Sequence, residues 1–412
     1  METWRRNLWV LWFGTFVASA SLTMVIPFLP LFLIDIGVHE NTEMWAGLLF
    51  SSTFMAAAIS SPYLGSLADK FGRKKMIIRA GFVLVIVFTL TSFVTNPYQL
   101  LALRIFHGLM AGYIPAVIAL IGTNTPDQKV GYALTTISTA TASGRILGPL
   151  LGGGIAHLFD NRAAFAFAGI LVFLSTLSVI FLVKEEKFAI AGARSSVFAS
   201  FKSAASNRTF SMVLLLSCLI SISVMTIEPV LSLYIVELGG AAKNTSLLAG
   251  FVFSLVGITG ILFATSWGKL ADKIGFRYVL IIGLSGGAIG SIAQIFFHDI
   301  WGFSIVRFIY GAFFCAVIPA INGLVVRSTP SDFRGRAFGL NNTANQLGSM
   351  IGPIIGGIIG GAFSTHGIFV GTGILLMIAV LLAHSISETR VVNNILANTD
   401  PKKELNPRVQ ET

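Results

Sequence analysis

Ionisable side chains inside long apolar stretches are the part of this sequence that can do chemistry. Glu228 stands in the second half of the apolar stretch 210–236, directly before Pro229, whereas the rest of the 18 acids fall in polar segments or at segment ends. Burial disfavours the charged form of a carboxyl group, so such an acid readily takes up a proton or attracts a cation. Glu228 is therefore the predicted site where a proton and a cationic ligand compete. The alternative is a structural partner for a buried arginine.

Basic residues also occur within the apolar stretches. Arg104 and His107 are three positions apart and so share one face of a helix. Histidine titrates near neutral pH, so His107 is a candidate for proton transfer, with a hydrogen-bonded neutral imidazole as the alternative. Arg145 is expected to pair with a carboxylate, or else to attract an anionic substrate. Arg307 in RFIYG is the repeat counterpart of Arg104 in RIFHG and is expected at an equivalent depth.

The elements that must hold these residues are helices that cross a lipid bilayer. Of 412 residues, 54% are hydrophobic and 11% are charged, and the mean hydropathy is +0.82; soluble proteins are about 25% charged. Apolar runs of roughly 20 residues can cross a hydrocarbon core about 30 Å thick, and their continuous apolarity favours helices over barrel strands. We predict an all-α integral membrane fold with twelve spans, at about 8–34, 44–66, 76–95, 98–123, 131–157, 163–183, 210–236, 246–267, 278–297, 301–326, 336–362 and 367–387.

The distribution of charge explains the net charge of +10. With the N-terminus in the cytoplasm, Arg162 and Lys243 are the basic residues in outer loops, and most of the others fall in cytoplasmic segments. This bias predicts a multi-pass protein of the cell (inner or plasma) membrane with both termini cytoplasmic, and it makes a nucleic-acid partner unnecessary. Cys218 and Cys315 fall within spans, which predicts free thiols.

The sequence repeats itself at a nearly fixed offset. GSLADKFGR at Gly65 recurs as GKLADKIGFR at Gly268, and GRILGPLLGG at Gly144 recurs as GSMIGPIIGG at Gly348. Two parallel six-helix repeats are one plan of secondary transporters, which bind substrate near the bilayer midplane between the halves. The predicted domains are an N-terminal six-helix bundle (1–183), a cytoplasmic linker (184–209), a C-terminal six-helix bundle (210–388) and a cytoplasmic tail (389–412).

The first copy of the loop motif carries a family resemblance. Its residues match the pattern G-x-L-A-D-x-x-G-R-K at Gly65, Leu67, Ala68, Asp69, Gly72, Arg73 and Lys74. On this motif and the repeats, the chain resembles a major facilitator superfamily transporter, and within that family it looks most like the single-chain multidrug:proton antiporters of bacteria. The resemblance implies a conformational latch that shuts the halves on the cytoplasmic side. Its predicted residues are Gly65, Asp69, Gly72, Arg73 and, in the second copy, Asp272. The alternative is that the bases of this loop only enforce topology.

A glycine-rich pattern in the fifth predicted span resembles the antiporter motif of drug exporters in the same superfamily. Its residues are Gly144, Gly148, Pro149, Gly152 and Gly153. Small residues at four-residue spacing also let helices pack closely, so plain packing is the alternative. The resemblance favours export over uptake.

The resemblance also implies roles for single residues. Family exporters carry R-x-x-x-G where Arg104 and Gly108 stand, with the arginine linked to proton transfer, and His107 stands where Gln is common. The predicted proton-coupling residues are therefore Glu228, Arg104 and His107. The side chains predicted to contact substrate are Glu228, Arg145, Asn322, Asn345 and Gln346. The amides among them could instead join helices.

Together these patterns predict a secondary transporter that exports structurally varied amphipathic drugs in exchange for protons by alternating access. Two alternatives stay open: a dedicated proton-coupled exporter of a sugar, metabolite or anionic antibiotic, and a membrane sensor on a transporter frame. An enzyme is disfavoured, because no nucleophile, base and orienting acid occur together and GRILGPLLGG lacks the Lys-Ser/Thr of a phosphate-binding loop. We expect no cofactor and no metal, small molecules and protons as ligands, the lipid bilayer as surroundings, and a functional monomer.

Overall fold

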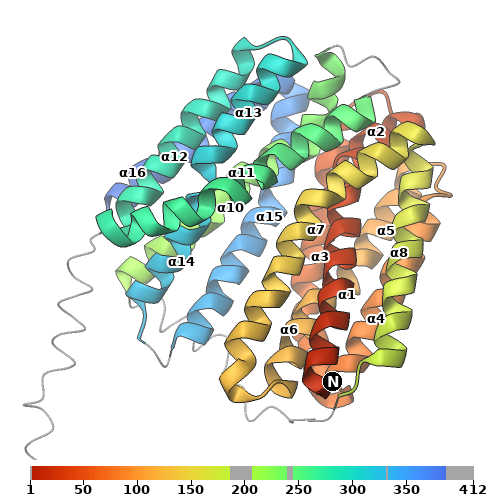
Figure 1. The fold of residues 1–412 in the computed structure, drawn as a ribbon. Helices are drawn as coiled ribbons and strands as arrows, with labels where there is room; N and C mark the ends of the chain where they lie inside the picture. The colour runs from red at the N-terminus through yellow and green to blue at the C-terminus, as the bar shows by residue number, and fades with distance from the viewer. Residues whose placement is uncertain (1, 186–206, 239–244, 331–332, 387–412) are drawn as a thin grey trace, which may run out of the picture.

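The structure, a computed structural model, describes residues 2–185, 207–238, 245–330 and 333–386, without the side chain of Asp69. Within these ranges the regular elements are helices packed side by side (Figure 1), so the all-helical prediction is confirmed there. They are α1 (Thr3–Val25), α2 (Phe28–Asp35), α3 (Thr42–Phe71), α4 (Arg73–Thr91), α5 (Pro97–Leu109), α6 (Tyr113–Asn124), η1 (Asp127–Lys129), α7 (Val130–Leu158), α8 (Asn161–Leu182), α10 (Arg208–Glu237), α11 (Thr245–Ile274), α12 (Phe276–Ala293), η2 (Gln294–Phe296), α13 (Ile300–Phe314), α14 (Val317–Ser328), α15 (Arg334–Phe363) and α16 (Thr365–His384).

Three predicted spans are each built from two helices. The first consists of α1 and α2, which are separated at Pro27, a residue without the N–H that would continue the first helix. The fourth consists of α5 and α6, and its break contains Gly112 with a φ of +123°. The guanidinium of Arg79 donates hydrogen bonds of 3.1 Å to the carbonyls of Met110 and Ala111 at this break. The tenth span is likewise divided into α13 and α14.

Within the described residues, ten helical segments are long and apolar enough to cross a membrane, by length and composition. The other two predicted spans, 76–95 and 131–157, correspond to α4 and α7 and are not among them. Arginine and lysine occupy the first turns of α4, and α7 is rich in Ser, Thr and Gly, which lowers the apolarity of both. Both nevertheless run alongside the other helices (Figure 1), α4 against α8 and α7 against α1. The count of twelve spans therefore stays a prediction.

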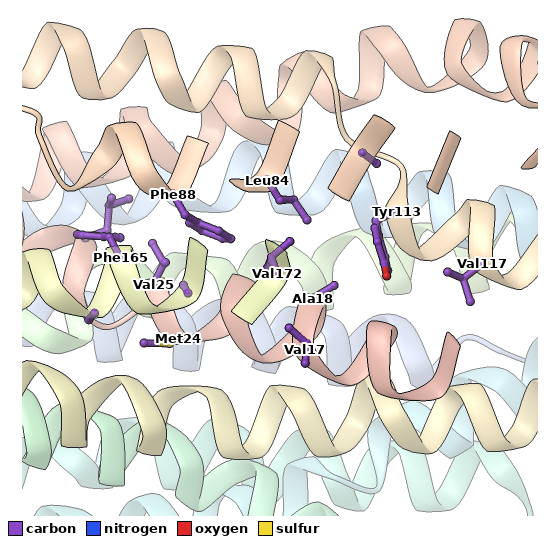
Figure 2. Close-up of a cluster of buried hydrophobic side chains, with 14 of the residues drawn as sticks. Val17, Ala18, Met24, Val25, Leu84, Phe88, Tyr113, Val117, Phe165 and Val172 are labelled. Carbon is purple, nitrogen blue, oxygen red and sulfur yellow. The ribbon is translucent and has the colours of Figure 1, made fainter. Parts of the chain in front are cut away.

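Each half of the chain buries apolar side chains of its own. In the first half, Val17 of α1, Phe88 of α4, Tyr113 of α6 and Phe165 of α8 belong to one buried cluster (Figure 2). The second half has separate clusters built from α10 and the helices after it. The predicted linker and tail fall mostly outside the described residues, so the domain boundaries stay a prediction.

The two ends of the bundle are distinguished by the turns they carry. We call the end with the N-terminus, at the bottom of Figure 1, the terminal face. The other end, which carries the turns at 36–41, 92–96 and 159–160, is the opposite face.

The halves meet along two crossed helix pairs, α3 with α15 and α7 with α11. Glycines permit the close approach. A Cβ atom on Gly250 of α11 would clash with the carbonyl oxygen of Pro149 in α7, and a Cβ on Gly47 of α3 would clash with the carbonyl oxygen of Pro353 in α15. All four residues lie in the parts of their helices nearer the opposite face. The two halves are therefore packed together at that face.

Candidate functional site

Arginines on two helices, α7 and α13, act on Glu228, the acid that the sequence indicated. The carboxylate of Glu228 in α10 interacts electrostatically with the guanidinium groups of Arg145 in α7 and Arg307 in α13. Within the described residues, neither arginine comes within the 4.0 Å of a direct ion pair with it. Since α7 belongs to the first half and α13 to the second, Glu228 is shared by cations from both halves.

Arg307 is held in a polar and aromatic pocket inside the second half. Its side chain is 6% exposed, and Nη1 donates a 3.3 Å hydrogen bond to Oε1 of Gln294. The guanidinium also lies 5.2 Å from the centre of the Tyr310 ring, which is stacked on Phe314 at 5.3 Å. Tyr310 interacts electrostatically with Glu228 as well. A buried cation needs such partners, because its desolvation is otherwise uncompensated.

Arg145 differs from Arg307 in that its side chain is exposed. The neighbouring glycines of α7 are buried against α1, whereas the arginine makes no hydrogen bond within the described structure. A long cationic side chain that is not packed can approach Glu228 or a bound ligand. The charge of Arg145 acts on Glu228 without a direct ion pair in the described part of the chain, so the predicted pairing of Arg145 with a carboxylate stays a prediction.

Arg104 and His107 form a second cluster within the first half. Their side chains are 6% and 8% exposed, and the charge of Arg104 acts on the imidazole. Nε and Nη2 of Arg104 and Nδ1 of His107 have no hydrogen-bond partner within the described residues. The structure therefore groups Arg104 with His107, apart from the cluster around Glu228. The predicted proton-transfer role of this pair stays a prediction.

The predicted antiporter motif is a packing surface on α7. Cβ atoms on Gly144, Gly148 and Gly152 would each meet atoms of α1, for example the carbonyl oxygen of Phe16 at 2.6 Å from Gly144. Gly153 instead faces α11 of the other half, where a Cβ would lie 3.3 Å from Cα of Gly250. Packing thus explains all four glycines, and the export role implied by the resemblance remains a prediction.

The predicted latch lies at the terminal face and contacts its own half. Gly72 separates α3 from α4 with a φ of +96°, and Gly275 does the same in the second half with +98°, so both copies use glycine for a turn. Arg73 donates a hydrogen bond to the hydroxyl of Thr123 in α6. Asp272 is exposed. Gly65 lies inside α3, and the side chain of Asp69 lies outside what the structure describes.

Glu185 is a partner of the loop motif that sequence reasoning missed. Its carboxylate accepts hydrogen bonds of 2.9 Å and 3.0 Å from the backbone N–H groups of Arg73 and Lys74, at the N-terminus of α4. A carboxylate is favoured there because helix N-termini carry unpaired N–H groups and partial positive charge. Nothing in the sequence relates Glu185 to a turn more than a hundred positions earlier.

The predicted substrate-contacting amides differ in their surroundings. Oδ1 of Asn345 accepts a 3.0 Å hydrogen bond from Ser221, which joins α15 to α10. Asn322 on α14 is exposed and Gln346 is partly buried. The bond at Asn345 fits the helix-joining alternative, and substrate contact at all three residues stays a prediction.

Tyr310 and Gln294, which face Arg307, were not among the predicted site residues. The repeat contains a signal for Tyr310, since it occupies the position in RFIYG that His107 occupies in RIFHG. Gln294 has no comparable signal, because it belongs to a different helical segment and reaches Arg307 only through the packing of α12 against α13.

Comparisons with known proteins agree on the family. The Major Facilitator Superfamily model matches residues 11–265 and 213–405. Multidrug resistance protein MdtG of Salmonella schwarzengrund (strain CVM19633) is 35% identical over 395 residues, covering 94% of this chain and 97% of that protein. MdtG of Proteus mirabilis (strain HI4320) is 33% identical over 354 residues, with 84% and 87% covered.

Solved structures resemble this one in fold. A bacterial homologue of the human lysosomal transporter Spinster, in an inward-facing and unoccupied conformation, has a TM-score of 0.81 at 14% identity, covering 96% of this chain and 98% of that one. The nucleoside transporter NupG has a TM-score of 0.77 at 12% identity, with 93% and 100% covered.

Proposed function

Because the chain belongs to the major facilitator superfamily, we propose that it is a secondary transporter that exports structurally varied amphipathic drugs in exchange for protons. It is a multi-pass membrane protein that handles small molecules. We place it in the cell (inner or plasma) membrane with the terminal face in the cytoplasm, acting as a monomer. The multidrug resistance relatives support the substrate class.

The observation that carries the proposal is the position of Glu228 among cations of both halves. When ionised, its carboxylate attracts Arg145 from the first half and Arg307 within the second. A proton on Glu228 removes that attraction, and so does a ligand cation that binds the carboxylate. The charge state of one acid then controls how strongly the two halves attract each other around Glu228, and a site between rocking halves can use this to couple exchange.

The closed opposite face supports a direction for this cycle. The glycine contacts of Gly47 and Gly250 bring the halves together there, so the state described is the one in which a drug would reach Glu228 from the terminal face. Release then requires the halves to separate at the opposite face. The predicted latch fits this scheme, since Arg73 bonds within its own half in this state and would engage the other half when the terminal face closes.

A second candidate is a dedicated exporter of an acidic compound. Two guanidinium groups face one carboxylate in the central cluster, and protonation of Glu228 would leave both cations available to an anion. The exposed side chain of Arg145 could then contact the ligand directly.

The test is proton release when drugs are added to the purified, detergent-solubilised protein. We expect several cationic drugs to release protons from the wild type and none from Glu228→Gln. The matched control is Glu237→Gln, which changes an acid at the end of the same helix that already accepts a hydrogen bond from Thr365. Proton release that persists in Glu228→Gln would contradict the proposal. Binding of anionic drugs alone, lost in Arg145→Ala, would favour the second candidate.

A further inference from the structure

Asn161, the first residue of α8, connects three helices at the opposite face. Its amide nitrogen Nδ2 donates a 2.7 Å hydrogen bond to Oδ2 of Asp35, the last residue of α2. Its amide oxygen Oδ1 accepts a 3.3 Å hydrogen bond from the hydroxyl of Ser246, in the first turn of α11. Asp35 and Asn161 belong to the first half and Ser246 to the second. The amide is therefore a polar link between the halves.

Asp35 determines which way the amide points. An ionised carboxylate only accepts hydrogen bonds, so it must face the NH2 group of Asn161. The amide oxygen of Asn161 then points toward Ser246, whose hydroxyl donates a hydrogen bond to it. Asp35 thus orients Asn161 although it does not itself contact the other half in this network.

The surrounding packing makes this link sensitive to separation of the halves. A Cβ atom on Gly153 of α7 would lie 2.9 Å from the carbonyl oxygen of Ser246 and 3.3 Å from Cα of Leu247. The start of α11 is thus held directly against the end of α7, beside Asn161. Any movement that opens the opposite face at this crossing must break the bond between Asn161 and Ser246.

In the part of the chain that the structure describes, the second crossing, between α3 and α15, shows no equivalent hydrogen bond between the halves. By the repeat, Thr365 occupies the position of Asn161, Glu237 that of Asp35 and Glu43 that of Ser246. The hydroxyl of Thr365 donates to Glu237 within the second half. The apolar stem of Glu43 packs 3.1 Å from a Cβ built on Gly360, and an ionised Glu43 has no hydrogen to donate to Thr365. The polar link is thus specific to the crossing of α7 and α11.

We propose that Asn161 is a positioning residue that holds the opposite face closed, with Asp35 orienting it toward Ser246. The bond forms when the halves meet at this face and breaks when they separate to release the ligand. The inference rests on the proposed function in one respect only, because it requires a cycle in which the two faces open in turn.

The first variant replaces the amide of Asn161, which both donates and accepts, by a carboxylate, which only accepts. Asn161→Asp removes the donor that faces Asp35 and sets two carboxylates against each other; their repulsion turns the side chain at 161 away from Asp35 and out of the position in which it accepts from Ser246. We expect the ratio of molecules open to closed at the opposite face to rise by about 2- to 10-fold, the range that a net hydrogen bond contributes. Pulsed electron spin resonance measures this ratio as a distance distribution between spin labels at His39→Cys and His298→Cys, in exposed turns of the two halves, with Cys218 and Cys315 replaced by Ser.

A charge exchange separates positioning from a general loss of stability. In the double variant Asp35→Asn with Asn161→Asp, the amide at position 35 donates to the carboxylate at 161, which still accepts from Ser246. The closed population should therefore return to the wild-type value. Ser246→Ala, a smaller change, should open the face without affecting Asp35, and it serves if Asn161→Asp does not fold.

Two outcomes would overturn the inference: a distance distribution in Asn161→Asp and Ser246→Ala that equals the wild type, or a double variant that stays as open as Asn161→Asp alone. Proton release measured on the same wild-type preparation keeps the proposed function separate. If drugs release protons but the distance distribution does not shift in Asn161→Asp and Ser246→Ala, the role of Asn161 is contradicted and the proposed function stands. If the distance distribution shifts in Asn161→Asp and returns in the double variant, but drugs release no protons, the role of Asn161 stands and drug–proton exchange is contradicted.

Discussion

Replacing Gly250 by alanine is expected to open the opposite face without unfolding either half. The added Cβ would clash with the carbonyl oxygen of Pro149 and lie 3.2 Å from Cα of Gly153, both on α7. These are backbone atoms of a long helix, so they cannot move aside singly. The strain falls on a contact between the halves, which exists only while this face is closed.

The magnitude follows from the cost of overpacking. An extra methyl group in a tight contact typically costs about 1–3 kcal/mol, which corresponds to an increase of about 5- to 150-fold in the ratio of open to closed molecules. Alanine also favours a helix over glycine by about 1 kcal/mol. Since α11 is helical whichever face is open, that gain cancels in the ratio.

Two control variants isolate the effect. Gly260→Ala changes the same helix where nothing lies within 4 Å of the added Cβ, so it should leave the ratio unchanged. Gly144→Ala introduces a Cβ 2.6 Å from the carbonyl oxygen of Phe16, a contact within the first half. It should lower the thermal unfolding midpoint while shifting the ratio less. An unchanged distance distribution in Gly250→Ala, or an equal shift in Gly260→Ala, would refute this account.

Three further variants test individual contacts seen in the structure. Glu185→Ala removes the acceptor of two backbone N–H groups at the start of α4 and should lower the free energy of unfolding by about 1 kcal/mol. Thermal unfolding measures this loss, with Glu185→Gln as the control. Equal midpoints for Glu185→Ala and the wild type would contradict the prediction. Ser217→Ala leaves the buried Oδ1 of Asn341 without its 2.6 Å partner and should cost about 1–3 kcal/mol in the same assay, so an unchanged midpoint would argue against this bond. Arg307→Lys should fail to restore the drug-induced proton release that Arg307→Ala loses, because an ammonium group lacks the planar fork that bonds Gln294 and faces an aromatic ring; full release in the lysine variant would show that charge alone suffices.

Local sequence patterns predicted much of the fold. Apolar length gave the helical membrane class, and the offset repeat placed Arg307 at a position equivalent to Arg104, with both side chains 6% exposed. The loop motif recurs in both halves, and the glycines at its corresponding positions, Gly72 and Gly275, share a positive φ. The same patterns did not predict the breaks within three spans, because Pro and Gly occur in several helices and only some of them interrupt one.

The candidate site was predicted in part. Glu228 and Arg145 were selected separately, each as a charge in an apolar segment, and in the structure both Arg145 and Arg307 interact electrostatically with Glu228. Arg104 and His107 were selected by the same reasoning, yet they lie in a separate cluster of the first half. Residue type in the sequence thus identified the candidates, whereas the packing of the helices was needed to show which candidates lie together.

By itself, the sequence determined that the chain is helical and membrane-spanning, that its motifs recur at a nearly fixed offset, and which residues carry charge into apolar segments. These are properties of consecutive residues or of a fixed offset, and they are read without knowing any contact. Only the tertiary structure decided that Glu185 accepts from the start of α4 and that Asn161 bonds Ser246 of the other half. The reason is physical. The lipid-facing and buried sides of a membrane helix are both apolar, so apolarity does not select its neighbours; close packing and a few polar contacts do. Hydropathy therefore specifies that a helix exists, while its partners follow from the three-dimensional fit of small residues such as Gly153 and Gly250.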